Sequence, residues 1–310
     1  MWWLLLIPVG VVLFVTGFAL YAWRTAFYMP RKERGAIFHM PNNEQYRACK
    51  PITDALRAEM EALPFEVVSI TSHDGLVLTG KYYHLRDGAP LQIQFHGYRG
   101  TALRDFCGGH KLAVEQGYNT LVIDQRAHGD SGGCNITFGL LERYDCLCWA
   151  RYAAARFPDT PIVLAGVSMG AATVLMAADL PLPETVRAIM ADSPYTTPCD
   201  IIRKVCADRG LPPSLAFPFV KLGARLYGGF RLTEEGAVHA VARTSVPLLI
   251  IHGEDDLFVP VEMSRALDAA CVGEHRLVTF PGAGHGLSYI VDPERYAAET
   301  AAFLDQYINR

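Results

Sequence analysis

The chain has 310 residues, enough for one large domain or two ordinary ones, and 51% of them are hydrophobic, which provides material for a substantial core. The net charge is -4, and no stretch interleaves arginines with aromatic residues, which argues against nucleic acid as a partner. The eight cysteines lack the Cys-x-x-Cys spacing of a zinc site or a redox motif, so we expect free thiols and no metal.

The first predicted element is an uncharged run from residue 2 to residue 23, which is long enough to cross a membrane as one helix. Tryptophan and tyrosine flank the run, as they do at membrane interfaces: Trp2, Trp3, Tyr21 and Trp23. A cleaved signal peptide is the alternative, but no lysine or arginine precedes the run and no small-x-small cleavage site follows it. We therefore predict a transmembrane anchor over residues 1–24 of a single-pass membrane protein.

Positive charge follows the predicted anchor at Arg24, Arg31, Lys32 and Arg34, whereas the other flank offers only the terminal amine. The positive-inside rule places the charged side of a span in the cytoplasm. We therefore expect the long C-terminal part of the chain to be cytoplasmic, which agrees with scattered cysteines in a reducing compartment.

Residues 25–62 are predicted to form a linker and a lead-in helix, because polar residues and prolines precede a short helical pattern over residues 52–63. Two runs that alternate apolar and polar residues then follow, Glu66–Thr71 and Leu76–Tyr83. They flank Ser72-His73-Asp74-Gly75, so the pattern predicts a β-hairpin with an Asp-Gly turn.

From residue 91 onward, strand patterns alternate with helical patterns. Strands are predicted over residues 91–95, 120–124, 162–166, 186–192, 248–252 and 276–280, and helices over residues 103–116, 140–157, 169–179, 261–270 and 293–308. Such alternation predicts a mainly parallel sheet covered by helices, and the apolar strands indicate that both of its faces are buried. We expect residues 63–310 to form this domain.

About fifty residues separate the strand over residues 186–192 from the next one, far more than an ordinary connection needs. This insertion, at about residues 194–246, contains helical patterns over residues 201–207 and 218–227 and predicts a small helical cap. Its large apolar residues either pack the cap onto the body or line the mouth of a pocket: Phe217, Phe219, Leu222, Leu226 and Tyr227.

A serine lies between two glycines where the strand over residues 162–166 meets the following helix, in Gly166-Val167-Ser168-Met169-Gly170. Between a strand and a helix, a Gly-x-Ser-x-Gly turn lifts the serine hydroxyl out of the sheet, and the glycines prevent collisions with neighbouring backbone. We predict that Ser168 is a nucleophile. An ordinary strand-to-helix turn is the alternative.

Ligands of open α/β sheets bind at the carboxyl ends of the strands, so the loops there matter most. The strand over residues 91–95 ends in His96-Gly97-Tyr98. The backbone N–H groups of Tyr98 and Met169 are predicted to form an oxyanion hole.

The last two strands end in candidate acids and a candidate base. The turn after residue 252 carries Glu254, Asp255 and Asp256, and the glycine loop after residue 280 carries His285. A buried carboxylate can orient an imidazole, and a histidine on such a loop can accept the proton of a serine from another strand.

These segments together resemble a serine hydrolase of the α/β-hydrolase superfamily, from about Leu63 to the C-terminus. The resemblance lies in His96-Gly97-Tyr98, Asp124-Gln125-Arg126-Ala127-His128-Gly129-Asp130-Ser131, Gly166-Val167-Ser168-Met169-Gly170, His252-Gly253-Glu254-Asp255-Asp256-Leu257-Phe258-Val259-Pro260 and Gly284-His285-Gly286. It implies an α/β-hydrolase fold with an eight-stranded, mainly parallel sheet and helices on both faces. It also implies the order nucleophile, acid and histidine, which Ser168, Asp256 and His285 keep.

The chain departs from the family pattern twice. Ala127 stands where the family usually has glycine, in a loop that is normally structural. Ala171 follows the serine motif where peptidase relatives often have a second glycine, which favours ester over peptide bonds.

Alternatives remain open for the acid and the base. Asp192 ends the strand after the nucleophile helix, where some hydrolases of this superfamily place their acid. His96 and His128 lie near the same edge of the sheet and could act as the base, although each could equally brace its glycine turn.

The sequence thus predicts a serine hydrolase that cleaves carboxylic esters through an acyl-enzyme and requires no cofactor. We expect small acyl ester substrates, delivered from the bilayer, with short peptides as the alternative. A catalytically silent hydrolase-fold protein that serves only in binding is the alternative of another class. The sequence leaves the oligomeric state open.

Overall fold

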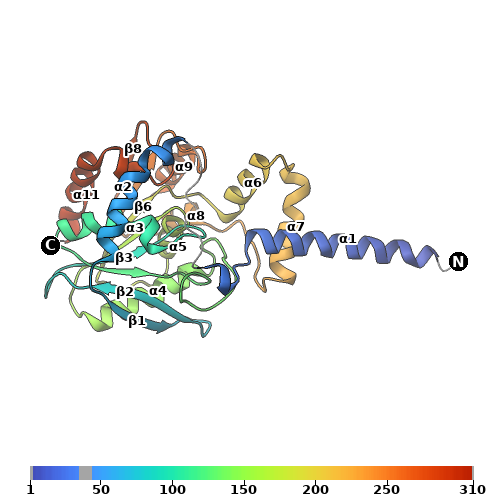
Figure 1. Ribbon diagram of the computed structural model, residues 1–310, viewed down its shortest axis with the longest axis horizontal. Coiled ribbons are helices and arrows are strands. Elements are labelled where there is room, and N and C mark those ends of the chain that lie inside the picture. Colours follow the sequence, from blue (N-terminus) through green and yellow to red (C-terminus); the bar gives the residue numbers. More distant parts are fainter. Residues whose placement is uncertain (1–2, 35–43, 309–310) are drawn as a thin grey trace.

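The computed structural model describes residues 3–34 and 44–308. Trp2 of the predicted anchor and residues 35–43 of the predicted linker lie outside these ranges. The described chain forms a sheet covered by helices on both faces, with a long N-terminal helix that projects from one end (Figure 1).

The sheet has the strand order β1-β2-β4-β3-β5-β6-β7-β8. β2 runs antiparallel to β1 and to β4, and all other neighbours are parallel. The bounds are β1 Glu66–Thr71, β2 Val77–Tyr83, β3 Leu91–Phe95, β4 Asn119–Ile123, β5 Ile162–Val167, β6 Val186–Asp192, β7 Leu248–Gly253 and β8 His275–Phe280. The predicted hairpin and the mainly parallel sheet of eight strands are therefore confirmed.

The helices follow the predicted alternation from β3 onward. Their bounds are α1 Trp3–Ala26, η1 Arg31–Glu33, α2 Glu44–Glu61, α3 Ala102–Glu115, α4 Glu142–Arg156, α5 Met169–Ala177, α6 Pro198–Asp208, α7 Pro213–Leu226, α8 Ala237–Val241, α9 Val261–Ala270, α10 Ser288–Val291 and α11 Pro293–Ile308.

The prediction for the lead-in helix was wrong at its start. α2 begins at residue 44 and contains Pro51, whereas the pattern predicted a helix only over residues 52–63. A proline inside a helix costs about 3 kcal/mol. The packing of α2 against α3 offsets this cost, because it buries Tyr46, Leu56 and Met60.

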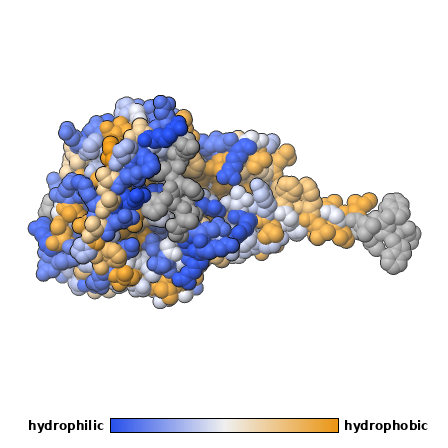
Figure 2. Space-filling view, in the orientation of Figure 1, coloured by the Kyte–Doolittle hydropathy of each residue, from blue (hydrophilic) through white to orange (hydrophobic). Residues whose placement is uncertain are grey.

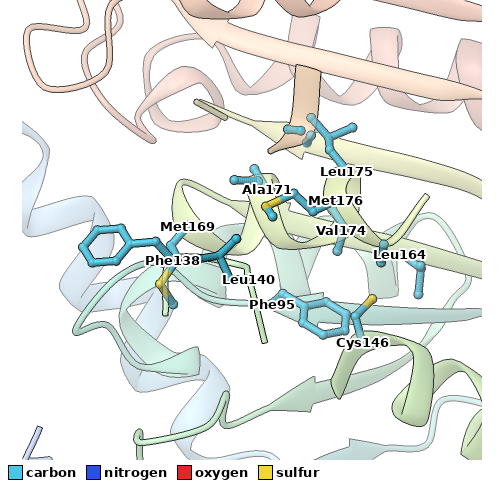
Figure 3. Packing of buried hydrophobic residues seen from close by; sticks show 14 of the residues in the cluster. Phe95, Phe138, Leu140, Cys146, Leu164, Met169, Ala171, Val174, Leu175 and Met176 are labelled. Carbon is cyan, nitrogen blue, oxygen red and sulfur yellow. The ribbon is translucent and has the colours of Figure 1, made fainter. Parts of the chain in front are cut away.

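Two buried clusters, one on each face of the sheet, hold the fold together. On one face, α4 and α5 pack against the strands, which buries Trp149 of α4 and every residue of α5. Figure 3 shows Val174 and Leu175 of α5 in this layer, together with Phe95 of β3 and Leu164 of β5. On the other face, α3 and α11 pack against the sheet, and α2 packs on α3. Burial on both faces explains why the central strands are mostly apolar, and the two buried glutamines of β3, Gln92 and Gln94, hydrogen-bond to each other at 2.6 Å.

The predicted cap corresponds to α6, α7 and α8, which lie between β6 and β7 in the chain. Phe217 of α7 is buried in the core. The rings of Phe219 and Tyr227 instead lie 5.6 Å and 6.0 Å from those of Phe18 and Trp23 in α1. The prediction that these residues pack the cap onto the body is therefore only partly right, because much of α7 packs against α1.

α1 is the one helix within the described residues that is long and apolar enough to cross a membrane. Its segment Ile7–Ala26 has a mean hydropathy of 1.6. Most of this segment extends away from the body, and its last turns cross α7 (Figure 1). The end of α1 lies beside the loop that follows β3, because the Tyr98 hydroxyl donates a hydrogen bond to the Ala26 carbonyl over 2.8 Å.

Candidate active site

Ser168 occupies a strained turn between β5 and α5. Its backbone has φ +56° and ψ −116°, in the region that non-glycine residues rarely adopt. A Cβ at Gly166 would collide with the Gly170 backbone, and a Cβ at Gly170 would collide with the carbonyl of Phe95. Glycine is therefore required at both positions for the turn to form, as the sequence pattern predicts.

A chain of hydrogen bonds joins Ser168 to residues from two other strand ends. The Nε2 atom of His285 lies 2.8 Å from the Ser168 Oγ. The Nδ1 atom of His285 lies 2.7 Å from the Asp256 Oδ2. These distances are within the range in which a histidine can take a proton from a serine while a carboxylate orients its ring.

The other oxygen of Asp256 is fixed by the backbone. Its Oδ1 accepts hydrogen bonds from the N–H groups of Phe258 at 2.9 Å and Val259 at 2.8 Å. Burial raises the pKa of Asp256, but hydrogen bonds from His252, His285 and the Val259 N–H outweigh it and hold the pKa well below its usual range. Asp256 is therefore ionised at neutral pH, and its charge favours an Nδ1–H on His285.

His252 is a neighbour of Asp256 to which sequence reasoning gave no role. Its Nε2 lies 2.8 Å from the Val259 carbonyl and 3.2 Å from the Asp256 Oδ2. Both of these oxygens only accept, so Nε2 carries the proton and Nδ1 accepts from the Ser264 hydroxyl at 2.6 Å. His252 is the first residue of the His-Gly-x-x-Asp pattern, and this position in the sequence could have indicated its role.

The rival acids occupy different positions. Asp192 ends β6 and is buried, and its side chain hydrogen-bonds with the Ser193 hydroxyl at 3.0 Å and with Tyr296. Burial raises the pKa of Asp192 to about 6. Glu254 and Asp255 are exposed, and Glu254 accepts a hydrogen bond from Thr279. Within the described chain, Asp256 is thus the acid that shares a hydrogen bond with His285.

His96 and His128 brace loops. The Nδ1 of His96 lies 2.8 Å from the Gly97 carbonyl, and its Nε2 accepts the Gln125 N–H. The Nε2 of His128 accepts the Arg99 N–H at 3.0 Å. Burial lowers the pKa of both imidazoles, so both are neutral and hold the two loops together.

The loop after β3 lies directly against Ser168. A Cβ at Gly97 would lie 3.3 Å from the Ser168 Cβ, so the residue before Tyr98 contacts the turn that precedes Met169. Within the described residues, neither N–H donates a hydrogen bond. An oxyanion hole requires N–H donors that are not already engaged.

Asp105 of α3 holds this loop in place. Its Oδ2 accepts the Gly97 N–H at 2.8 Å, and the Arg104 guanidinium donates to both of its oxygens. Burial raises the pKa of Asp105, but Arg104 outweighs burial and keeps the pKa below its usual range. Sequence reasoning missed this pair because its two charges lie within an ordinary helical pattern.

A cavity of about 240 Å³ opens at Ser168 and His285. It is lined by residues of α2, α3 and the segment around α10, among them Tyr46, Phe106 and Tyr289. The Tyr46 hydroxyl donates to the His285 carbonyl over 2.5 Å. No described residue of the cap lines this cavity, which does not support the alternative that cap residues form the pocket mouth, and residues of α2 line the cavity instead.

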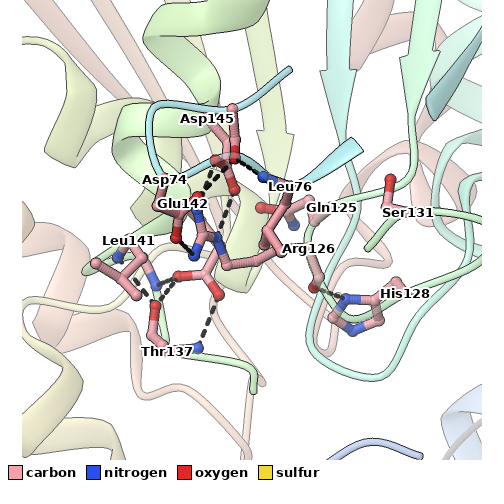
Figure 4. A network of polar contacts seen from close by, with 12 residues as sticks. Asp74, Leu76, Gln125, Arg126, His128, Ser131, Thr137, Leu141, Glu142 and Asp145 are labelled. Atoms are coloured by element: carbon pink, nitrogen blue, oxygen red, sulfur yellow. Dashed lines mark hydrogen bonds and ion pairs between the residues drawn. The ribbon is translucent and has the colours of Figure 1, made fainter. Parts of the chain in front are cut away.

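A buried ionic cluster supports the loop after β4 (Figure 4). The Arg126 guanidinium donates to Asp145 at 2.6 Å and 2.7 Å, and to Asp74 at 2.9 Å and 3.2 Å. His73 lies close enough to both acids for the three to hold a metal ion. Arg126 already supplies the positive charge between the two carboxylates, so the cluster is explained without a metal.

The chain belongs to the alpha/beta hydrolase family, whose model matches residues 95–299. The resemblance seen in the sequence motifs is confirmed, and the fold is the one that it implied. This family membership places the chain among the alpha/beta hydrolases, and the similar proteins include an esterase and a lysophosphatidylserine lipase, which supports a hydrolase.

Three similar proteins illustrate these relationships. The uncharacterized protein YqkD of Bacillus subtilis is 26% identical over 251 residues, which cover 80% of this chain and 80% of that protein. The lysophosphatidylserine lipase ABHD12 of Rattus norvegicus is 29% identical over 196 residues, which cover 59% of this chain and 46% of the lipase, so the match spans less than half of that protein. An esterase of Pyrococcus furiosus has a similar structure, with a TM-score of 0.66, 22% identity, and coverage of 87% of this chain and 97% of the esterase.

Proposed function

We propose that the protein is a serine hydrolase that cleaves carboxylic esters, with Ser168 as nucleophile, His285 as general base and Asp256 as the acid that orients the imidazole. The hydrogen bonds from Ser168 through His285 to Asp256 carry this proposal. The strained turn at Ser168 supports it, because the turn presents the hydroxyl to a cavity large enough for part of a substrate.

In the proposed reaction, His285 Nε2 takes the Ser168 proton as Oγ attacks the carbonyl carbon of the ester. The Tyr98 and Met169 N–H groups donate to the oxyanion that forms, and Asp256 stabilises the imidazolium without taking its proton. The imidazolium then protonates the departing alcohol as the C–O bond breaks and the acyl-enzyme remains. Water, deprotonated by His285, attacks the acyl group and releases the acid and Ser168. These steps need no cofactor.

We infer that the substrates are acyl esters of moderate apolarity that reach the site from a membrane. The Tyr98 hydroxyl bonds to the Ala26 carbonyl, and Arg99 donates to the carbonyls of Thr25 and Tyr28 at 3.1 Å and 3.0 Å. The candidate oxyanion loop therefore lies at the base of the apolar helix. The similarity to a lysophosphatidylserine lipase favours the same class of substrate.

The membrane arrangement is part of the same proposal. Residues 1–24 serve as a single transmembrane anchor, residues 25–62 as the linker and lead-in helix, and residues 63–310 as the hydrolase domain with a cap at about residues 194–246. The basic residues that follow α1 favour a cytoplasmic location of the domain. A reporter enzyme that is active only outside the cytoplasm, fused after Arg310, would test the orientation. Its activity would contradict the proposal.

Covalent labelling tests the nucleophile. A fluorophosphonate probe should label the full chain, and Ser168→Ala should abolish labelling with the fold intact, while turnover falls about 10⁴-fold or more. Ser193→Ala is the matched control, since Ser193 directly follows the neighbouring strand β6 and also has φ +56°. Full labelling of the Ser168→Ala protein would contradict the assignment.

A substrate panel tests the class of bond. We expect p-nitrophenyl acyl esters to be hydrolysed and matched short peptide amides to be resistant. Faster cleavage of the peptides would identify a peptidase. Absence of both activities together with absence of probe labelling would identify a protein that only binds.

A further inference from the structure

The cap helix α7 carries large apolar side chains that the described chain leaves exposed. Leu215, Phe219, Leu222 and Leu226 recur at helical spacing along α7; Phe219 and Leu222 are half-buried, and the ring of Phe219 packs against that of Phe18 in α1. Leu215 is 68% exposed and Leu226 is 53% exposed. Exposed apolar residues that lie together on one helix indicate an interaction surface.

Contacts between α7 and α1 fix where α7 lies along the length of α1. A Cβ at Gly223 would collide with the Ala19 carbonyl, so only glycine allows the two backbones to approach this closely. The Tyr227 hydroxyl, just after α7, donates to the Thr16 carbonyl at 3.1 Å. α7 therefore crosses α1 at its last turns, near Ala19.

The length of α1 then decides where α7 lies relative to a membrane. At about 1.5 Å per residue, the segment Trp3–Phe18 before the crossing extends about 24 Å. The hydrocarbon core of a bilayer is about 30 Å thick. If α1 spans that core, the crossing point lies at or inside the membrane boundary. Because α7 runs across α1 in Figure 1, it would lie along the membrane surface.

The surface chemistry of this region agrees with such a position. Figure 2 shows that apolar surface continues from the projecting helix onto the adjoining part of the cap. α7 contains no acidic residue, and its charged residues are both basic: Arg225 is exposed, whereas Lys221 pairs with Glu234 at 3.2 Å. Long basic side chains on a helix at the interface can reach the phosphates of lipid headgroups while apolar neighbours enter the acyl layer.

We propose that α7 is an interfacial lipid-binding helix, whose Leu215 and Leu226 insert among the acyl chains of the bilayer that α1 crosses. This inference rests on the proposed membrane anchor. The protein is then held by one spanning helix and one helix that lies in the interface. This second contact sets the distance between the hydrolase domain and the membrane, and keeps the loop that carries Tyr98 close to the lipid.

Photocrosslinking to lipid tests this proposal. A benzophenone amino acid is placed, one position at a time, at Leu215 or Leu226 in the full chain, reconstituted in vesicles of phosphatidylcholine and phosphatidylglycerol. Leu13, 66% exposed on α1, serves as the reference for the anchor. Val272, 70% exposed just before the edge strand β8, is the matched control on the body.

We expect lipid adducts at Leu13, Leu215 and Leu226, with at least tenfold less at Val272. Adducts at Leu13 without adducts at either position of α7 would overturn the inference and leave the anchor intact. Absence of adducts at Leu13 would overturn the anchor, and the inference with it. Equal adduct yields at Val272 and on α7 would also overturn the inference, because contact with lipid would not be specific to that helix.

Discussion

Replacing Asp256 by Asn should disable the reaction without disturbing the fold. The N–H groups of Phe258 and Val259 donate to the Oδ1 of Asp256, so the carbonyl oxygen of an asparagine must occupy that position. Its NH₂ group then occupies the position of Oδ2, 2.7 Å from the Nδ1 of His285. An NH₂ group only donates there, so Nδ1 must accept and the ring proton moves to Nε2.

This change of tautomer explains the size of the expected effect. With its proton on Nε2, His285 cannot accept the proton of Ser168, which lies 2.8 Å away. A wrong tautomer in such an arrangement lowers kcat about 10⁴-fold, which corresponds to about 5.5 kcal/mol in the activation free energy. KM should change little, because Asp256 does not contact the substrate in the proposed reaction.

The assay compares Asp256→Asn with Asp192→Asn in kcat and KM for a p-nitrophenyl ester, with circular dichroism and Tm as controls for folding. Asp192→Asn should retain most of the wild-type kcat, since Asp192 shares no hydrogen bond with His285 among the described contacts. If Asp256→Asn stays within tenfold of the wild type, or if Asp192→Asn is the disabled variant, the assignment of the acid is wrong.

Three further changes test other parts of the structure. Because burial raises the pKa of Asp192 from 3.8 to about 6, the folded protein binds the proton more tightly than the unfolded chain, and stability falls as pH rises through this window. Asp192→Asn should therefore raise Tm at pH 7 and leave it nearly unchanged below pH 4. Arg126→Ala leaves Asp145 buried without its ion-pair partner and should lower the free energy of unfolding by about 3–5 kcal/mol, measured by urea denaturation. Asp105→Ala frees the Gly97 N–H and should lower kcat about tenfold to a hundredfold with KM nearly constant, whereas an equal loss of Tm and kcat would indicate a purely structural role.

Much of this protein follows from sequence patterns alone, because the deciding interactions are local. The strands and the main helices after β2 follow from apolar periodicity, and the turn at Ser168 follows from glycines that the backbone requires on either side. The carboxyl ends of parallel strands meet at one edge of the sheet. Because Ser168, Asp256 and His285 each follow such a strand, the sequence predicted that they would lie close together.

The tertiary structure decided what covers the site and what positions it. No local pattern shows that α2 runs through Pro51 to bring Tyr46 onto His285, because packing against α3 outweighs the cost of the proline. Nor does any pattern show that Asp105 reaches the Gly97 N–H or that α7 packs on α1. These contacts join segments far apart in the chain, and their free energy depends on burial and geometry that exist only once the sheet has formed.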